Sequence, residues 1–227
     1  MKKKTGFTLS EVLITLTLIG IITTLTIPSL VASTDKSKKA TTFKKAYNSV
    51  SGAYTQALTE KPGITNVSDL ADAMIKHLNV KYFIKPADAE VADSKPTKES
   101  THGLTKSDNN KDNETNWIIT EDGIGYKIKQ VLQTNKACDL KKVDFAAAST
   151  FDDTKYCYLI TIDIDGPQKG NNADAEVTVD NENEISAIAG DRFYVYATQQ
   201  GLTAGNKDWT GATSSQVAAA KVLEAND

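Results

Sequence analysis

The chain has 227 residues, with 26 lysines and arginines against 29 aspartates and glutamates, and a formal net charge of −3 at pH 7. This slightly acidic balance argues against nucleic acid as the default partner. Once the apolar N-terminal stretch is set aside, the remaining length leaves room for one domain of ordinary size.

The first thirty residues carry the most informative pattern of the chain. Three lysines, Lys2 to Lys4, precede an apolar stretch of helix-forming residues that contains a single carboxylate, Glu11. A charge at hydrocarbon depth is costly, so it is rarely kept in a membrane segment without a partner or a purpose. Cleavage after Gly6 would create a partner, because the new amine on Phe7 is largely cationic near neutral pH and lies on the same helix face as Glu11.

A known cleavage motif matches this pattern. The residues that carry the match are Gly6, Phe7, Thr8, Leu9, Ser10, Glu11, Val12, Leu13 and Ile14, followed by Ile19, Gly20, Ile21, Ile27 and Pro28. They resemble the prepilin-type motif of type IV pilins and of the pseudopilins of type II secretion and competence systems. The resemblance implies that a prepilin peptidase cuts between Gly6 and Phe7 and methylates the new amine. The other implied partners are pilin or pseudopilin subunits and the lipid of the inner membrane.

The resemblance also implies how subunits assemble. They are first held in the inner (cytoplasmic) membrane by a single span, with the domain outside the cytoplasm. They then pack helix against helix in a filament, in the periplasm or at the cell surface. There Glu11 of one subunit pairs with the Phe7 amine of its neighbour and sets the axial register, because a wrong register leaves a buried charge unpaired. Pro28 removes one backbone hydrogen bond and is expected to bend the helix.

Two other interpretations of the N-terminus stay open. A secretory signal peptide has a similar basic start, with a cleavage site at Val31, Ala32 and Ser33, but the apolar stretch from Val12 to Ala32 exceeds the usual length of about 7 to 15 residues. An uncleaved anchor also fits, since roughly 20 mainly apolar residues span a bilayer. Neither interpretation gives Glu11 a role.

The helical pattern resumes after Pro28 and predicts one helix from Phe7 to Lys61, which ends because Pro62 follows. Its buried face is marked by apolar residues at helical spacing, namely Phe43, Tyr47, Val50, Tyr54 and Ala57. The predicted division is a leader at residues 1–6, a transmembrane and filament-core helix at 7–32, an amphipathic second half of the helix at 33–61 and an extracytoplasmic pilin-like domain at 62–227.

The domain is predicted to be α+β and pilin-like, with the long N-terminal helix packed on a C-terminal antiparallel sheet. Ser68 is expected to cap a short helix that runs to Asn79. A polar loop is predicted over residues 85–116, the sheet over 117–202 and the tail over 203–227. The predicted elements are a hairpin of Trp117–Thr120 and Ile124–Ile128, a strand Tyr156–Ile164, a hairpin of Val177–Val179 and Ile185–Ile188, a strand Arg192–Ala197 and a helix Ser214–Glu224.

Four oxygen-bearing side chains flank the two best strands of the sheet. Asp163 and Asp165 are predicted to point to the same side, opposite the isoleucines, and Asn171 and Asp191 to close on them through the intervening turn. Oxygen ligands gathered in this way suit calcium. The alternative is that these acids cap ordinary turns.

A second resemblance covers the same region. The runs from Asp163 to Asn171 and from Gly190 to Phe193 resemble the strand-loop-strand signature of many pilin-like proteins, although here Asn172 to Ala189 are inserted between the two runs. Resemblance to major pseudopilins implies calcium in a comparable loop. No other cofactor is expected.

The two cysteines, Cys138 and Cys157, favour a disulfide if the domain lies outside the cytoplasm. Such a bond closes a loop of about 20 residues and contributes roughly 3 kcal/mol in the chain-entropy model. The spacing fits neither a CxxC redox motif nor a zinc site. The alternative is a pair of buried thiols in a reducing compartment.

The sequence therefore favours a structural subunit of a type IV pilus or of a secretion-type pseudopilus. A second interpretation is a minor pilin with an adhesive or ligand-binding role, in which the inserted segment 172–189 and the polar loop form the recognition surface. A third is an ordinary secreted or anchored domain. An enzyme is not expected, because His77 and His102 stand apart in the sequence and no nucleophile elbow, phosphate-binding loop or HExxH motif occurs.

Overall fold

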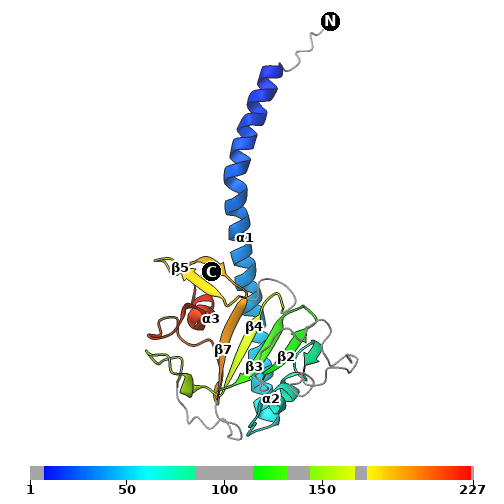
Figure 1. Cartoon of the computed structure of the whole chain (residues 1–227), viewed down its shortest axis with the longest axis vertical. Coiled ribbons are helices and arrows are strands. Elements are labelled where there is room, and N and C mark those ends of the chain that lie inside the picture. Colours follow the sequence, from blue (N-terminus) through cyan, green and yellow to red (C-terminus); the bar gives the residue numbers. More distant parts are fainter. Residues whose placement is uncertain (1–7, 85–114, 132–143, 167–172, 226–227) are drawn as a thin grey trace. The chain divides into compact units, whose positions relative to one another are not determined.

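A computed structural model of the chain describes residues 8–84, 115–131, 144–166 and 173–225 (Figure 1). The chain divides into two compact units, Met1–Lys38 and Lys39–Asp227. In chain order the elements are α1 (Leu9–Glu60), α2 (Val67–Met74), β1 (Val80–Ile84), β2 (Thr115–Thr120), β3 (Gly125–Gln130), the 3-10 helix η2 (Asp153–Lys155), β4 (Tyr158–Asp163), β5 (Glu176–Val179), β6 (Ile185–Ala189), β7 (Arg192–Thr198), β8 (Gly201–Thr203) and α3 (Ser214–Glu224). A long N-terminal helix followed by a curled antiparallel sheet confirms the predicted α+β, pilin-like class.

The first unit is the apolar part of α1. The helix runs without interruption through Pro28, and it is long and apolar enough to cross a membrane by length and composition. Its large apolar side chains are exposed, namely Leu9, Val12, Leu13, Ile14, Leu16, Leu18, Ile19, Ile21, Ile22, Ile27, Leu30 and Val31. Such a surface requires lipid or another apolar partner to cover it.

The threonine hydroxyl groups within this apolar stretch are hydrogen-bonded to the backbone of the same helix. Each donates a hydrogen bond of 2.6 to 3.0 Å to a backbone carbonyl three or four residues earlier, and the set is Thr15, Thr17, Thr23, Thr24, Thr26 and Thr34. A hydroxyl bonded in this way does not enter hydrocarbon as an unsatisfied donor. The threonines are therefore compatible with a membrane-spanning helix.

In the second unit, α1 from Lys39 onward packs against the sheet, as the apolar spacing predicts (Figure 1). Phe43 is fully buried and its ring stacks on that of Phe193 with centroids 4.2 Å apart. The buried hydroxyl of Tyr54 donates a hydrogen bond of 3.0 Å to the carbonyl of Thr198. The helix ends at Glu60, close to the predicted end at Lys61.

The predicted limits of the second helix are wrong at both ends. Helix α2 is capped by Asn66, whose side chain accepts a hydrogen bond of 2.8 Å from the backbone N–H of Asp69, and Ser68 lies within the helix. The helix ends at Met74 rather than at Asn79, since the chain turns there and enters β1.

Six strands form one antiparallel sheet in the order β1-β2-β3-β4-β7-β8. The predicted hairpin of β2 and β3 is confirmed, although β2 begins at Thr115, inside the predicted polar loop. The rest of that loop, residues 85–114, lies outside the described residues. Strands β1 and β8 were not predicted.

Strand alternation gives the sheet two different faces. One face is apolar and packs against α1 and α2, with Tyr126, Ile128, Ile160, Ile162, Phe193 and Val195 fully or almost fully buried. On the opposite face a smaller cluster forms from Phe145, Tyr156, Tyr196, Trp209 and Val217. Helix α3 packs beside this cluster, and the Tyr196 hydroxyl donates a hydrogen bond of 2.8 Å to the carbonyl of Gln216 in its first turn.

The inserted segment forms a separate two-stranded sheet of β5 and β6, as predicted. Despite this insertion, β4 and β7 pair directly, with Asp163 opposite Arg192 at the end of the ladder. The β5–β6 hairpin is therefore inserted between two strands, β4 and β7, that still pair with each other. Its base lies close to Asp163 and Asp191, two of the predicted metal ligands.

Candidate functional site

The predicted processing residues, Gly6 and Phe7, lie outside the described residues. Glu11 is described and forms a reciprocal cap at the start of α1. Its carboxylate accepts a hydrogen bond of 2.7 Å from the backbone N–H of Thr8 and one of 2.8 Å from the Thr8 hydroxyl. In return, the N–H of Glu11 donates to the Thr8 hydroxyl oxygen at 3.3 Å. This is a capping box, in which two backbone donors that lack helical partners are satisfied.

The capping box gives Glu11 a local role that the charge argument overlooked. The signal is present in the sequence, since a threonine three residues before a glutamate at the start of an apolar helix is the signature of this motif. The same signature occurs at α3, where Thr213 and Gln216 cap the helix. Glu11 therefore has a helix-capping role besides its predicted role in pairing with a neighbouring amine.

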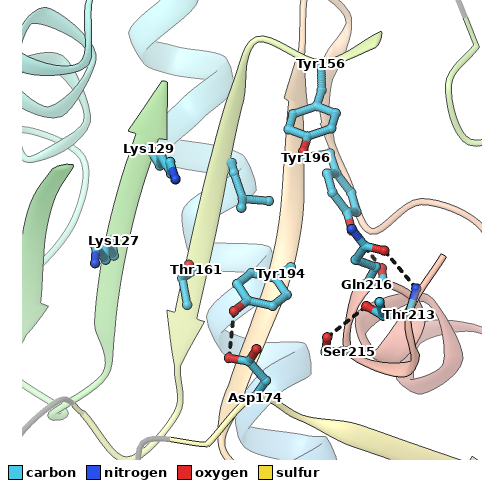
Figure 2. A pocket seen from close by; sticks show the side chains of 11 residues that line it. Lys127, Lys129, Tyr156, Thr161, Asp174, Tyr194, Tyr196, Thr213, Ser215 and Gln216 are labelled. Carbon is cyan, nitrogen blue, oxygen red and sulfur yellow. Dashed lines mark hydrogen bonds between the residues drawn. The ribbon is translucent and has the colours of Figure 1, made fainter. Parts of the chain in front are cut away.

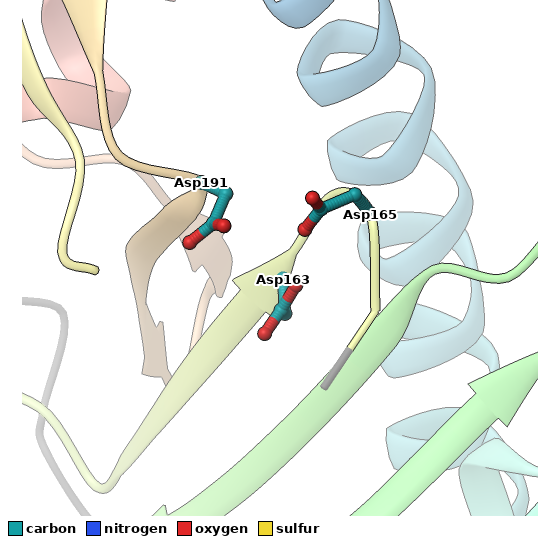
Figure 3. A group of neighbouring side chains, drawn as sticks. All are labelled: Asp163, Asp165 and Asp191. Atoms are coloured by element: carbon teal, nitrogen blue, oxygen red, sulfur yellow. The ribbon is translucent and has the colours of Figure 1, made fainter. Parts of the chain in front are cut away.

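Three of the four predicted metal-ligating residues come together in the structure. One carboxylate oxygen of each of Asp163, Asp165 and Asp191 lies within 4.8 Å of the others, and Figure 3 shows the three side chains converging. Asp163 is the last residue of β4, Asp165 follows in the turn, and Asp191 directly precedes β7. The fourth predicted ligand, Asn171, lies outside the described residues.

Two glycines allow the backbones around this cluster to approach closely. Gly166 has a φ of 84° and Gly190 a φ of 72°. A Cβ atom at Gly166 would collide with the carbonyl of Gly123, and one at Gly190 would collide with the carbonyl of Asp174. Glycine is the residue that adopts this backbone conformation without steric cost. The sequence thus brings the turn after β4 and the turn before β7 together.

The cluster is unusually buried for a group of three acids. Asp163 is 0% exposed and Asp191 is 4% exposed. The Nε of Arg192 donates to Oδ2 of Asp163 at 3.2 Å, but Oδ1 of Asp163 and Oδ1 of Asp191 have no hydrogen-bond partner in the described part of the chain. Buried oxygens of this kind require a proton or a cation.

Burial dominates the electrostatics of the cluster. It raises the pKa of Asp163 to about 7, although the nearby guanidinium of Arg192 acts in the opposite direction. Burial also raises the pKa of Asp191, and the negative charge of Asp165 adds to this shift. The surroundings of Asp163 and Asp191 therefore disfavour the ionised forms of these two acids unless positive charge enters the cluster.

The donor set fits a calcium ion. Calcium takes six to eight oxygen ligands, commonly carboxylates and backbone carbonyls, at about 2.3 to 2.6 Å. Asp163, Asp165 and Asp191 would supply hard oxygen ligands, and Asp163 and Asp191 each have a buried carboxylate oxygen without a hydrogen-bond partner among the described residues. When bound, calcium would neutralise the cluster and join the ends of β4 and β7.

The structure describes one of the two cysteines of the predicted disulfide. Cys157 is buried in the main core beside β4, with 2% exposure, while Cys138 lies outside the described residues. The pairing of Cys138 with Cys157 stays a prediction.

Of the two histidines, the structure describes His77. His77 lies at the edge of the α2 region with its Nε2 3.1 Å from a carboxylate oxygen of Glu60, and His102 lies outside the described residues.

A groove that was not predicted lies on the outer face of the sheet, and we call it the outer groove (Figure 2). Its volume is about 470 Å³. Its floor follows two cross-strand rows of the sheet, Lys127 opposite Thr161 and Tyr194, and Lys129 opposite Leu159 and Tyr196. Its other lining residues are Tyr156, Asp174, Thr213, Ser215 and Gln216. Strand alternation places the lysines, Leu159, Thr161 and the two tyrosines of β7 on one face, and residues at the start of α3 form another part of the lining.

A comparison with known protein families gives a match at the N-terminus of the chain. Residues 1–27 match the family model described as the prokaryotic N-terminal methylation motif, which is the prepilin leader of type IV pilins and pseudopilins. A comparison with curated proteins gave no match, and neither did one with solved structures. The motif supports a type IV pilin-like subunit that is processed as a prepilin, and it points to a structural protein rather than to an enzyme.

Proposed function

We propose that this chain is a structural subunit of a type IV pilus or of a secretion-type pseudopilus. A prepilin peptidase removes residues 1–6 and methylates the amine of Phe7. Before assembly, the apolar part of α1 anchors the subunit in the inner membrane, with the domain outside the cytoplasm. It then assembles with other subunits by packing this helix against theirs.

One observation carries the proposal. The methylation motif at residues 1–27 leads directly into the helix Leu9–Glu60, whose N-terminal part exposes large apolar side chains. Exposed apolar area is removed from water equally well by lipid and by neighbouring helices, so one surface serves both the stored monomer and the filament. A soluble domain with a removable signal peptide would not need the helix to continue into the core of the domain.

The mature N-terminus tests the first step of the proposal. Mass spectrometry of the protein from a host that has a prepilin peptidase is expected to find N-methylated Phe7 as the first residue. A chain that begins at Met1 supports an uncleaved anchor, and one that begins near Thr34 supports an ordinary signal peptide. Either result would overturn the proposal.

A set of three variants separates the two roles of Glu11. Glu11→Gln keeps an oxygen that can cap the N–H of Thr8 but removes the charge, whereas Thr8→Val keeps the charge and removes the hydroxyl of the capping box. Glu11→Ala removes both. If the charge sets the register, Glu11→Gln and Glu11→Ala lower filament yield alike and Thr8→Val leaves it near wild type.

Processing serves as the control for these variants, because cleavage measured by a gel shift is expected to stay intact in all three. A filament yield that is normal in Glu11→Gln and low in Thr8→Val would show that capping, rather than charge pairing, is the function of this residue.

We also propose that the three-acid cluster of Asp163, Asp165 and Asp191 binds calcium. The convergence of three carboxylates with two buried, unsatisfied oxygens supports this assignment. Isothermal calorimetry of the chain in detergent micelles is expected to record binding heat with calcium. An absence of heat at millimolar calcium would indicate that the cluster is neutralised by a shared proton instead.

A further inference from the structure

The outer groove has the size and the lining of a site for a small polar ligand. Its volume of about 470 Å³ lies within the usual range of about 300 to 1,000 Å³ for ligand pockets. Its lining combines tyrosine rings with hydroxyl, amide and carboxylate groups, which come from β3, β4, β7, α3 and the segment before β5. The proposed function uses none of these residues.

Tyr194 supplies the aromatic surface of the groove. Its side chain is half-buried, whereas the other two tyrosines of the lining, Tyr156 and Tyr196, are buried. The Tyr194 hydroxyl donates a hydrogen bond of 2.6 Å to Oδ1 of Asp174, which fixes the ring on the floor of the groove (Figure 2). The face of an aromatic ring attracts C–H groups that carry a partial positive charge. Tyr194 can therefore pack against a ligand that has a face made of C–H groups.

Three polar side chains close to this ring can form hydrogen bonds with a ligand. Thr161 lies opposite Tyr194 on β4, and its hydroxyl can both donate and accept. Asp174 uses Oδ1 for the Tyr194 hydroxyl, which leaves Oδ2 as an acceptor. Gln216 uses Oε1 to accept the backbone N–H of Thr213 at 2.8 Å, which leaves Nε2 as a donor. The groove thus offers both donors and acceptors around an aromatic ring.

The charges of the lining favour an uncharged ligand. Lys127 and Lys129 both interact with other groups of the chain, so neither is free for an anion. The carboxylate of Asp174 would repel an anion that approached Tyr194. A ligand that fits is therefore neutral, with several hydroxyl groups and one apolar face. A neutral hexopyranose has this chemistry, because its hydroxyl groups donate and accept and one side of its ring consists of C–H groups.

We propose that the outer groove binds a neutral hexopyranose residue, which packs its C–H face on Tyr194. The sugar hydroxyl groups bond to Thr161, Asp174 and Gln216. Because hydrogen bonds within the chain already hold Tyr194, Asp174 and Gln216, little side-chain freedom is lost on binding. This inference goes beyond the proposed structural function, and it does not depend on filament assembly.

Saturation-transfer NMR on the full chain tests the site directly. The chain is held in dodecylphosphocholine micelles, because this detergent has no sugar head group. The probes are the methyl glycosides of glucose, galactose and mannose, with N-acetylneuraminic acid as an anionic sugar. At least one neutral glycoside is expected to receive saturation from the protein, and the anionic sugar is not. Transfer to none of the neutral glycosides, or to the anionic sugar alone, would overturn the inference.

Three conservative variants assign the bound sugar to the groove. Thr161→Val removes the hydroxyl and keeps the shape of the side chain. Asp174→Asn replaces the second acceptor by a donor and keeps an oxygen for the Tyr194 hydroxyl. Gln216→Glu replaces the donor by an acceptor and keeps an oxygen for the N–H of Thr213. Each variant is expected to raise the dissociation constant about tenfold, which corresponds to the loss of one hydrogen bond.

Matched controls make the same changes outside the groove. Thr178→Val alters an exposed threonine of β5 and Asp208→Asn an exposed aspartate, and both are expected to keep the wild-type dissociation constant. Groove variants that bind as tightly as the wild type would overturn the inference, because the sugar would then lie elsewhere. Since the measurement uses the unassembled chain, a missing filament or an unprocessed N-terminus would contradict the proposed function and leave this result unchanged.

Photolabelling of the wild type keeps the inference testable if a variant fails to fold. The glycoside that binds is prepared with a diazirine group, which loses nitrogen on irradiation and leaves a carbene that inserts into a nearby bond. Mass spectrometry is expected to find the label on peptides that contain Thr161, Tyr194 or Gln216. A label confined to other peptides would show that the groove is not the site.

Discussion

The three-acid cluster offers the sharpest test of how this domain is stabilised. The change is Asp163→Asn, which removes one charge and keeps the shape of the side chain. Asp163 is the most informative position because it is 0% exposed and its Oδ1 has no partner among the described residues. The assay is thermal unfolding of the chain in detergent micelles at pH 8, in calcium and in a chelator.

Calcium is expected to raise the Tm of the wild type. At a free calcium concentration of one hundred times the dissociation constant, binding stabilises the folded state by about 2.7 kcal/mol. For a domain of this size each kcal/mol shifts Tm by about 2 to 4 °C, so the rise is about 5 to 10 °C. A hundredfold loss of affinity in Asp163→Asn would leave about 0.4 kcal/mol at the same calcium concentration, and the rise is then close to zero.

In the chelator, the order of the two melting temperatures is expected to reverse. The pKa of Asp163 is raised to about 7 by burial in spite of Arg192, so its surroundings as a whole disfavour the charged form. At pH 8 without calcium, Asp163→Asn is therefore expected to unfold at a higher temperature than the wild type. Asp208→Asn, which makes the same change at an exposed residue, is expected to match the wild type in both conditions. Equal calcium responses in wild type and Asp163→Asn would refute the reasoning.

Two further predictions concern the folding of the domain. In chelator, the Tm of the wild type is expected to fall as pH rises from about 4 to about 7, because the raised pKa of Asp163 stabilises the folded state at low pH and this stabilisation is lost on ionisation. Unfolding scans across that range check this, and a flat profile would contradict it. Phe43→Ala is expected to lower the free energy of unfolding by about 3 to 5 kcal/mol, since it empties a fully buried site stacked on Phe193. Urea titration measures the loss, Asn48→Ala on the exposed side of the helix is the control, and a loss below about 1 kcal/mol would contradict the packing.

Local signals account for the elements that were predicted well. Helix α3 has the predicted bounds, Ser214–Glu224, because a capping box starts it. The β2–β3 hairpin follows from an Asp-Gly turn between two apolar runs, and Gly123 there has a φ of 87°. In each case neighbouring residues in the sequence supply the interaction that determines the boundary.

Three elements were missed or misplaced, each for a different reason. Strand β1 pairs with β2, although about thirty residues separate the two strands in the sequence, so the pairing is not local. Strand β8 has three residues, which is too short for an alternating pattern. At α2 two good caps, Asn66 and Ser68, stand two residues apart, and the structure uses the first of them.

Some features of the candidate sites were predicted from the sequence and others were missed. Alternation along β4 and the pairing of β4 with β7 were sufficient to place Asp163, Asp165 and Asp191 together. The ion pair of Asp163 with Arg192 was missed, although register alone puts the two residues opposite each other. The outer groove was beyond prediction, because its walls come from β3, β7 and α3, and no single stretch of sequence contains it.

The β5–β6 hairpin connects the three-acid cluster to helix α3. Its root is held on the helix side, where the Lys39 ammonium donates a hydrogen bond of 3.1 Å to the carbonyl of Gly190, and on the sheet side by Asp191 in the acid cluster. Its tip is held by Asn183 on α3. A cation that neutralises the cluster would fix the root without touching the tip. Calcium in the cluster would therefore restrain the root of a hairpin whose tip is already held on α3 by the hydrogen bond of Asn183.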